Sequence, residues 1–151
     1  MAAPVQIKEI VDALQMQFDE LSSYLDLETG EVHIVSHDLL ALAEDLDEDD
    51  DDDDDPELEL ARRAAAGEGM LELPTKFDVH EWAIMQRFAG TPKSIKVRQE
   101  LHRALHGRGA FRIFKEAIRR HGVEQDWYHF RDDALRQIAI DWCEANGLAW
   151  Q

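Results

Sequence analysis

The chain has 151 residues, an apolar share of 44% and a formal net charge of −17. This length is sufficient for one domain with a buried core that needs no metal or disulfide. A membrane span needs about 18 consecutive apolar residues, and the sequence contains no such run.

The single cysteine, Cys143, excludes an internal disulfide and fits a reducing compartment. Lys8 and Glu9 fall where a signal peptide needs its apolar stretch. We therefore expect a cytoplasmic protein that does not associate with membranes.

Charge is distributed unevenly along the chain. Residues 1–75 hold 3 Lys/Arg and 23 Asp/Glu, a net of −20, whereas residues 76–151 hold 13 and 10, a net of +3. Much of the difference comes from Glu44–Glu59, with 13 acidic and no basic residues, including seven consecutive aspartates from Asp49 to Asp55. The average charge would repel nucleic acid at long range, but it conceals a mildly basic C-terminal half.

The N-terminal elements begin with a helix predicted over Val5–Met16, where apolar residues recur at helical spacing. Two β-prone runs, Tyr24–Leu27 and Val32–Val35, flank the Gly-containing segment Glu28–Glu31 and predict a β-hairpin. Ser36 is the expected N-cap of a short helix that runs into the acidic segment.

The tract Asp47–Asp55 is expected to be solvated and disordered, since like charges repel and aspartate is a poor helix former. Pro56–Ala66 permits a helix, which Gly67 and Gly69 end. Met70–Pro74 predicts a third short strand.

The remainder is helical in pattern. Asp78 and Glu81 predict a capping box ahead of the first C-terminal helix. Ser94 is the expected cap of the second helix, which Gly107 stops.

Gly109–His121 predicts the third helix, with Phe111, Phe114 and Ile118 in a buried stripe. Arg131–Asn146 predicts the last helix. Before it lies a predicted aromatic cluster of Trp127, Tyr128 and Phe130.

These elements predict an α+β fold. A small antiparallel sheet, made of the hairpin plus one strand, would pack on a bundle of about four C-terminal helices, with the poly-Asp segment as an insertion. Within one compact domain, residues 1–44 would form the N-terminal elements, residues 45–68 the acidic insertion, and residues 69–151 the third strand and helices.

Three segments resemble a known family: YLDLETGEV at 24–32, LHGRGAFRIFKEAI at 105–118, and WYHFRDDALRQIAIDWCEANG at 127–147. Together they resemble the bacterial Uncharacterised Protein Family 0158. The resemblance covers most of the chain outside residues 46–69 and implies a compact bacterial cytoplasmic domain. It implies no activity, cofactor or site residue.

The candidate functional surface is the basic face of the helix at 109–121, where Arg112, Lys115 and Arg119 are spaced i, i+3, i+7. Arg108 and Gly109 lie in the turn before it. A cation beside a glycine turn and a helix N-terminus favours phosphate or carboxylate binding.

Neighbouring residues would extend this surface. Arg98 and His102 share a face of the preceding helix, and Tyr128 and His129 could stack on bases. The structural alternative to anion binding is that Gly107–Gly109 is only a helix–helix turn. In that case Glu116 would form ordinary surface ion pairs with Arg112 and Arg120 at i, i+4 spacing.

Other candidates for chemistry are weak. His102 and His106 have zinc-ligand spacing, but no CxxC or HExxH accompanies them. Asp26, Glu28 and Glu31 surround the hairpin turn, where acids usually serve turn geometry. We therefore predict no catalytic residue, metal or cofactor.

The leading hypothesis is a non-enzymatic interaction or regulatory module. Its basic helices would hold an anionic partner, such as RNA, DNA or a protein, with the acidic segment as an electrostatic gate. The alternatives are an enzyme acting on a small phosphorylated or nucleotide substrate at the same site, and a purely structural protein–protein interaction domain.

Overall fold

The computed structural model describes residues 4–16, 19–45 and 56–151. They form two compact units. Unit one is the described part of Met1–Lys76 together with Ala139–Gln151, and unit two is Phe77–Ile138. The division expected from the sequence, into residues 1–44, 45–68 and 69–151 within one compact domain, stays a prediction.

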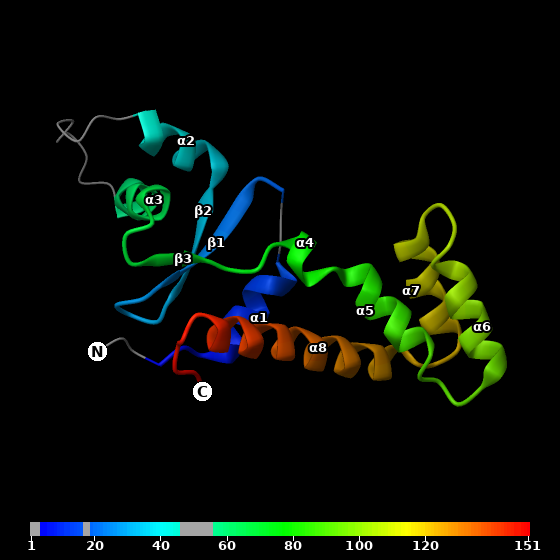
Figure 1. Ribbon diagram of the computed structural model, residues 1–151. Coiled ribbons are helices and arrows are strands. Elements are labelled where there is room, and N and C mark those ends of the chain that lie inside the picture. The colour runs from blue at the N-terminus through cyan, green and yellow to red at the C-terminus, as the bar shows by residue number, and fades with distance from the viewer. Residues whose placement is uncertain (1–3, 17–18, 46–55) are drawn as a thin grey trace. The chain divides into compact units, whose positions relative to one another are not determined.

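Unit one contains a three-stranded antiparallel sheet (Figure 1). Its strands are β1 (Leu21–Asp26), β2 (Val32–Ser36) and β3 (Met70–Glu72), in the order β2-β1-β3. Gly30 has a φ of 74°, the left-handed conformation that glycine adopts without steric cost, and it closes the β1–β2 turn. The predicted hairpin and third strand are confirmed.

The helices that precede the second unit are α1 (Ile7–Gln15), α2 (His37–Asp45) and α3 (Pro56–Ala66). The Ser36 hydroxyl accepts the Leu39 N–H at 3.1 Å, as predicted for a helix cap. The sheet, α2 and α3 share a small core, which is formed by Val35, Ala43, Leu58 and Ala61.

The N-terminal helix begins two residues later than predicted because Val5 belongs to a β-bridge instead. Val5 and Trp150 pair in parallel, and the Val5 N–H donates to the Ala149 carbonyl at 2.9 Å. The Gln151 N–H donates back to the Val5 carbonyl, also at 2.9 Å. Val5 is only 3% exposed, so this pairing fixes both chain ends of unit one to each other.

Helices account for most of unit two, with α4 (Lys76–Val79) beginning at the last residue of unit one. The others are α5 (Glu81–Ala89), α6 (Ile95–Ala104), α7 (Ala110–Arg120) and the first part of α8 (Glu124–Ala145).

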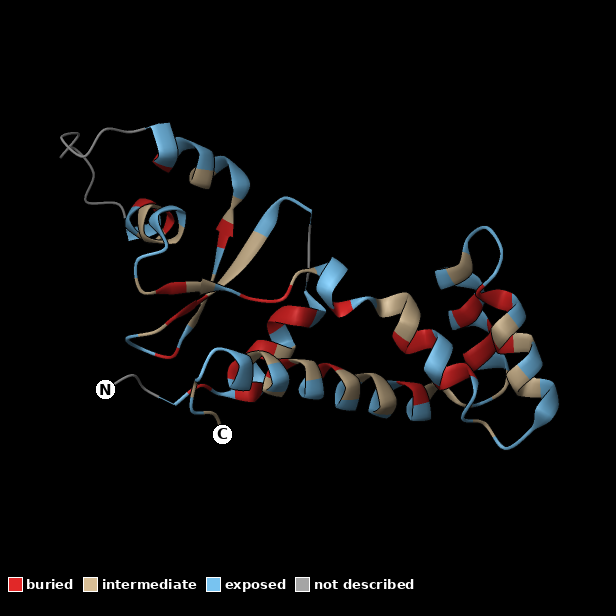
Figure 2. Ribbon diagram, viewed as in Figure 1, coloured by how far each residue is buried: buried red, intermediate tan, exposed pale blue. Residues whose placement is uncertain are grey.

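The core of unit two is aromatic. Phe88 of α5, a helix with both buried (red) and exposed (pale blue) positions in Figure 2, is buried, and its ring centroid lies 5.4 Å from that of Trp127 and 5.5 Å from that of Phe130. Phe114 of α7 lies 5.3 Å from Trp127, and all these rings meet edge to face. Such pairs stabilise by about 0.5–1.5 kcal/mol beyond the area they bury.

Two predicted helix starts are wrong. Asp78 lies inside α4 and not at a cap, and α5 begins after His80, whose φ is 53° and whose side chain makes no capping bond. The last helix begins at Glu124 and not at Arg131. The aromatic cluster forms part of its first turns, because Trp127 and Phe130 are three residues apart and both reach Phe88.

Other helix boundaries agree with the sequence. The Ser94 hydroxyl accepts the Val97 N–H at 3.4 Å, which confirms the predicted cap of α6. The predicted α+β class, with its hairpin, third strand and C-terminal helices, is confirmed. The predicted disorder of Asp47–Asp55 falls outside the described residues. Among those that are described, no helix has the length and apolar character needed to cross a membrane.

Candidate anion-binding site

The basic surface predicted from the sequence is built on α7. Gly109 precedes this helix with a φ of 67°, a conformation that side-chain-bearing residues rarely adopt. Phe114, Ala117 and Ile118 turn inward and are at most 2% exposed. The predicted cations of α7, Arg112, Lys115 and Arg119, lie outside this buried side and are exposed.

The far end of this surface is neutralised. Arg119 Nε lies 3.7 Å from Glu124 Oε1 at the start of α8. The Tyr128 hydroxyl donates to the same Glu124 oxygen at 2.8 Å. This hydrogen bond raises the pKa of Tyr128, since ionisation would place a second negative charge beside the carboxylate. The structure therefore brings two predicted residues, Arg119 and Tyr128, together at a carboxylate.

Residues predicted to widen the surface have different environments. Arg98 Nη1 donates to the carbonyls of Pro92 at 2.7 Å and Lys93 at 3.2 Å, so it holds the turn before α6. His102 is half-buried and His129 is exposed.

The surface pairs considered as the structural alternative are not the ones observed. Arg120 pairs with Glu100 of α6 at 3.4 Å, and not with Glu116. His121 also contacts Glu100. Its hydrogen bond holds the pKa of Glu100 below the ordinary value. This cluster joins α6 to the C-terminal end of α7, where Arg120 is paired with a carboxylate.

Three of the predicted cations are left over. Arg108, Arg112 and Lys115 are all exposed, and across residues 56–151 the structure records no ion pair for any of them. They lie together at the start of α7, one on the turn and two on the first two helical turns. Of the predicted anion-binding residues, these three with Gly109 form the part that stays open.

Phe111 belongs to the same surface, and its predicted place in the core is wrong. Its side chain is 48% exposed, whereas Phe114 is 0% and Ile118 is 2% exposed. At about 100° per residue, the buried alanine at 117 shifts the centre of the buried arc away from Phe111. That small inward residue was the signal that the sequence offered for an exposed ring.

A second polar centre lies in unit one, around Asp26 at the end of β1. Its side chain is 5% exposed and is paired with Arg63 of α3, with both oxygens 3.3 Å from guanidinium nitrogens. The Glu28 N–H donates to Asp26 at 3.0 Å, and His33 Nε2 lies 3.6 Å away. Burial alone would raise the pKa of Asp26, but the hydrogen bonds from Arg63 and Glu28 outweigh it and lower the pKa.

The turn interpretation of Asp26 is therefore correct but incomplete. The Asp26 carboxylate accepts the Glu28 N–H within the hairpin turn and so stabilises the turn, as predicted. The bond to Arg63 adds a tertiary role, because it ties the hairpin to a helix 37 residues further along the chain.

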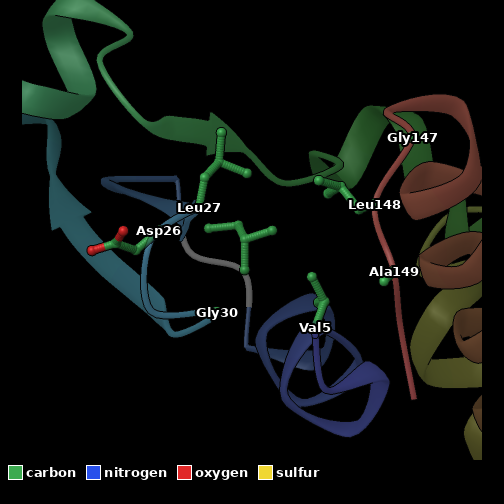
Figure 3. Close-up of a pocket in the computed structure, with 8 residues that line it drawn as sticks. Val5, Asp26, Leu27, Gly30, Gly147, Leu148 and Ala149 are labelled. Atoms are coloured by element: carbon green, nitrogen blue, oxygen red, sulfur yellow. The ribbon is translucent and has the colours of Figure 1, made fainter. Parts of the chain in front are cut away.

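A cavity of about 220 Å³ lies next to this turn (Figure 3). The Asp26 carboxylate points away from Val5 and Leu148 in this view. The cavity wall is therefore mainly apolar and glycine-rich, formed by Val5, Leu25, Asp26, Leu27, Gly30, Gly147, Leu148 and Ala149. Within the described ranges, no group of three or more His, Cys, Asp or Glu side chains is arranged to hold a metal ion.

Fold and site together define an α+β chain whose helical second unit presents an exposed cationic helix face. The chain belongs to the Uncharacterised protein family (UPF0158), whose sequence profile matches residues 2–150, and the resemblance seen in the sequence is confirmed. It is similar to the UPF0158 protein PA5073 of Pseudomonas aeruginosa, with 27% identity over 141 residues. That match covers 91% of this chain and 82% of the relative. No solved structure matches the chain.

Proposed function

We propose that the protein is a non-enzymatic interaction module that binds an anionic partner through the start of α7. The observation that carries this proposal is the set of three exposed cations, Arg108, Arg112 and Lys115, without an ion pair in the described part of the chain. Neighbouring cations at Arg119 and Arg120 each have a carboxylate partner. An exposed, unpaired cationic cluster gains most from a polyanion, because binding releases the counterions of that polyanion.

The charge of the two units supports the same proposal. Phe77–Ile138 hold 12 Lys/Arg and 8 Asp/Glu, a net of +4, and the rest of the chain holds 4 and 25, a net of −21. Unit two is therefore the part of the chain to which a polyanion would be attracted. In the proposal, the negative charge of the seven aspartates of Asp49–Asp55 opposes polyanion binding at that surface and so acts as an electrostatic gate.

The direct test is a charge reversal at Arg108, Arg112 and Lys115 together, with binding to inorganic polyphosphate measured by competition against heparin–agarose. The matched control reverses Lys93, Arg103 and Arg136, which are also exposed and belong to unit two. Both triple variants change the net charge equally. We expect the first to lose at least about tenfold in affinity and the control to lose much less.

Equal losses in both triple variants would show that only overall charge matters, and the assignment to α7 would then be wrong. The gate is tested separately by replacing Asp49–Asp55 with asparagine. Deletion of the whole acidic segment is unsuitable, because Leu58 and Ala61 of α3 belong to the core of unit one. If the asparagine variant binds polyphosphate no more tightly at low salt, the gate is refuted and the α7 surface is not.

The enzymatic alternative at this site and the structural protein–protein alternative stay predictions.

A further inference from the structure

We infer that the anionic partner is single-stranded nucleic acid, with a base stacked on Phe111; this inference rests on the proposed function of the α7 surface. Phe111 is 48% exposed, on a helix whose inward residues Phe114 and Ile118 are at most 2% exposed. Ring contacts recorded within unit two join Phe88, Phe114, Trp127 and Phe130 with one another and Trp82 with His106, and Phe111 takes part in none of them.

The position of this ring among the cations identifies the class of partner. Lys115 follows Phe111 by four residues, one helical turn away on the same side, and Arg112 is adjacent. Proteins that bind single strands combine cations that follow the phosphates with aromatic rings that stack on unpaired bases. A duplex keeps its bases stacked inside and offers them poorly to such a ring. An acidic peptide would use the cations but would leave the ring without a matching group.

Tyr128, predicted from the sequence to stack, is a poorer platform. Its hydroxyl is bound to Glu124, so a base on this ring would bring its phosphate towards a carboxylate. Phe111 instead has Arg112 and Lys115, at the start of α7, as its neighbours on the helix.

The turn before α7 provides an independent observation. Gly109 needs to be glycine because of its positive φ. Gly107 has no such φ, and a Cβ built there would meet no atom within 4 Å. The fold therefore gives neither a conformational nor a packing reason for glycine at 107. Glycine at such a position allows another molecule to approach the backbone closely.

The experiment measures fluorescence anisotropy of labelled poly(U), poly(dT), a duplex of the same length and poly-glutamate, with inorganic polyphosphate as a competitor. Phe111→Ala should weaken binding to the single strands by about 5- to 150-fold, the usual range for one stacked base. Its affinity for polyphosphate should stay within about twofold, since the cations are intact. Phe111→Trp should retain single-strand binding, which a merely structural role of the ring would not explain.

Ile113→Ala is the matched control, because Ile113 is 37% exposed but lies about 160° around α7 from Phe111. It should leave all affinities unchanged. Gly107→Ala should fold normally, since the added methyl group has free space, and should weaken single-strand binding. A further comparison of poly(U) with poly(dU), which differ only in the 2′-hydroxyl, shows whether that group contributes.

Several results overturn the inference while the proposed function stands. These are equal binding of duplex and single strand, tighter binding of poly-glutamate, or an equal loss of polyphosphate and poly(U) affinity in Phe111→Ala. By contrast, if the triple charge reversal on α7 leaves polyphosphate binding intact, the proposed function itself fails.

Discussion

Removal of the guanidinium from the buried ion pair of unit one is the most direct test of how that unit is held together. The perturbation is Arg63→Met, which keeps an apolar stem of similar length. In this variant the Asp26 carboxylate would keep the backbone N–H groups of Glu28 and Thr29 and, at 3.6 Å, His33 as polar neighbours, but no guanidinium. A buried carboxylate that loses its cation cannot recover the lost interaction from water.

The magnitude follows from the geometry. Breaking a fully buried pair by removing one partner costs about 3–5 kcal/mol. Here the Arg63 side chain is 24% exposed and both nitrogen–oxygen distances are 3.3 Å, long for charge-assisted bonds. We therefore expect Arg63→Met to lower the free energy of unfolding by about 2–3 kcal/mol at pH 7. Asp26→Asn should cost about 1–2 kcal/mol, because Arg63 can still reach water.

The pH dependence has a defined sign. The folded-state pKa of Asp26 is lowered, so its stabilising contribution is present above its unfolded pKa of about 3.9 and is lost as pH falls through the folded value. In Arg63→Met the burial remains while the largest lowering influence is gone, so the Asp26 pKa rises relative to the wild type. Asp26 is then protonated at a higher pH in the variant than in the wild type, which removes the unpaired buried charge. The difference in the free energy of unfolding between wild type and variant should therefore narrow as pH falls from 7 to about 4.

The assay is urea unfolding followed by far-UV circular dichroism at several pH values, on both single variants and the double variant. A coupling energy of at least about 1 kcal/mol between Asp26 and Arg63 is expected. A coupling below about 0.5 kcal/mol, or a gap that widens as pH falls, would refute the reasoning.

Three further predictions concern packing, backbone and thiol chemistry. Leu58→Ala should lower the free energy of unfolding by about 2–4 kcal/mol, because Leu58 is 4% exposed, while Leu42→Ala at a 49% exposed position should cost under about 1 kcal/mol in the same urea experiment. Gly69→Ala should cost more than Gly67→Ala, since both have positive φ but only the Cβ at 69 would come within 3.2 Å of the guanidinium of the buried ion pair; thermal unfolding of the two variants gives the difference. Burial raises the pKa of the Cys143 thiol, so iodoacetamide at pH 8 should alkylate it slowly in the native protein and rapidly in urea, and fast native alkylation would contradict the burial.

Local signals explain what the sequence predicted well. The hairpin follows from two β-prone runs and a glycine placed where the turn needs a positive φ. The cap at Ser94 follows from a hydroxyl that can reach an N–H three residues later. Each of these features depends on residues within a few positions of each other, so the sequence specifies them without knowledge of the fold.

Features that depend on distant residues could not be predicted. Asp26 and Arg63 are 37 residues apart, and the intervening acidic run gives no indication that they meet. The capping box at Asp78 failed because a separate short helix already contains that residue. The late predicted start of the last helix has the same origin, since the inward place of Trp127 on that helix is evident only once its partner Phe88 is known.

The candidate surface was predicted in part for the same reason. Helical spacing alone places Arg112 and Lys115 on one exposed face. Which cations are paired depends on α6 and α8, which supply Glu100 and Glu124. Phe111 was missed because a stripe defined by large residues overlooks the small alanines that share the buried side of a helix.

The net charge of −17 is therefore a poor guide to the electrostatic potential at the α7 surface. At physiological ionic strength charges act over about 8 Å, so this potential is set by the side chains closest to the surface. At low salt the screening length grows to about 30 Å, so more distant charges contribute as well. Replacement of Asp49–Asp55 by asparagine should consequently raise polyphosphate affinity strongly at low salt and only slightly at physiological salt. An equal gain at both ionic strengths would mean that the aspartates contact the surface directly, because close contacts are screened much less than distant ones.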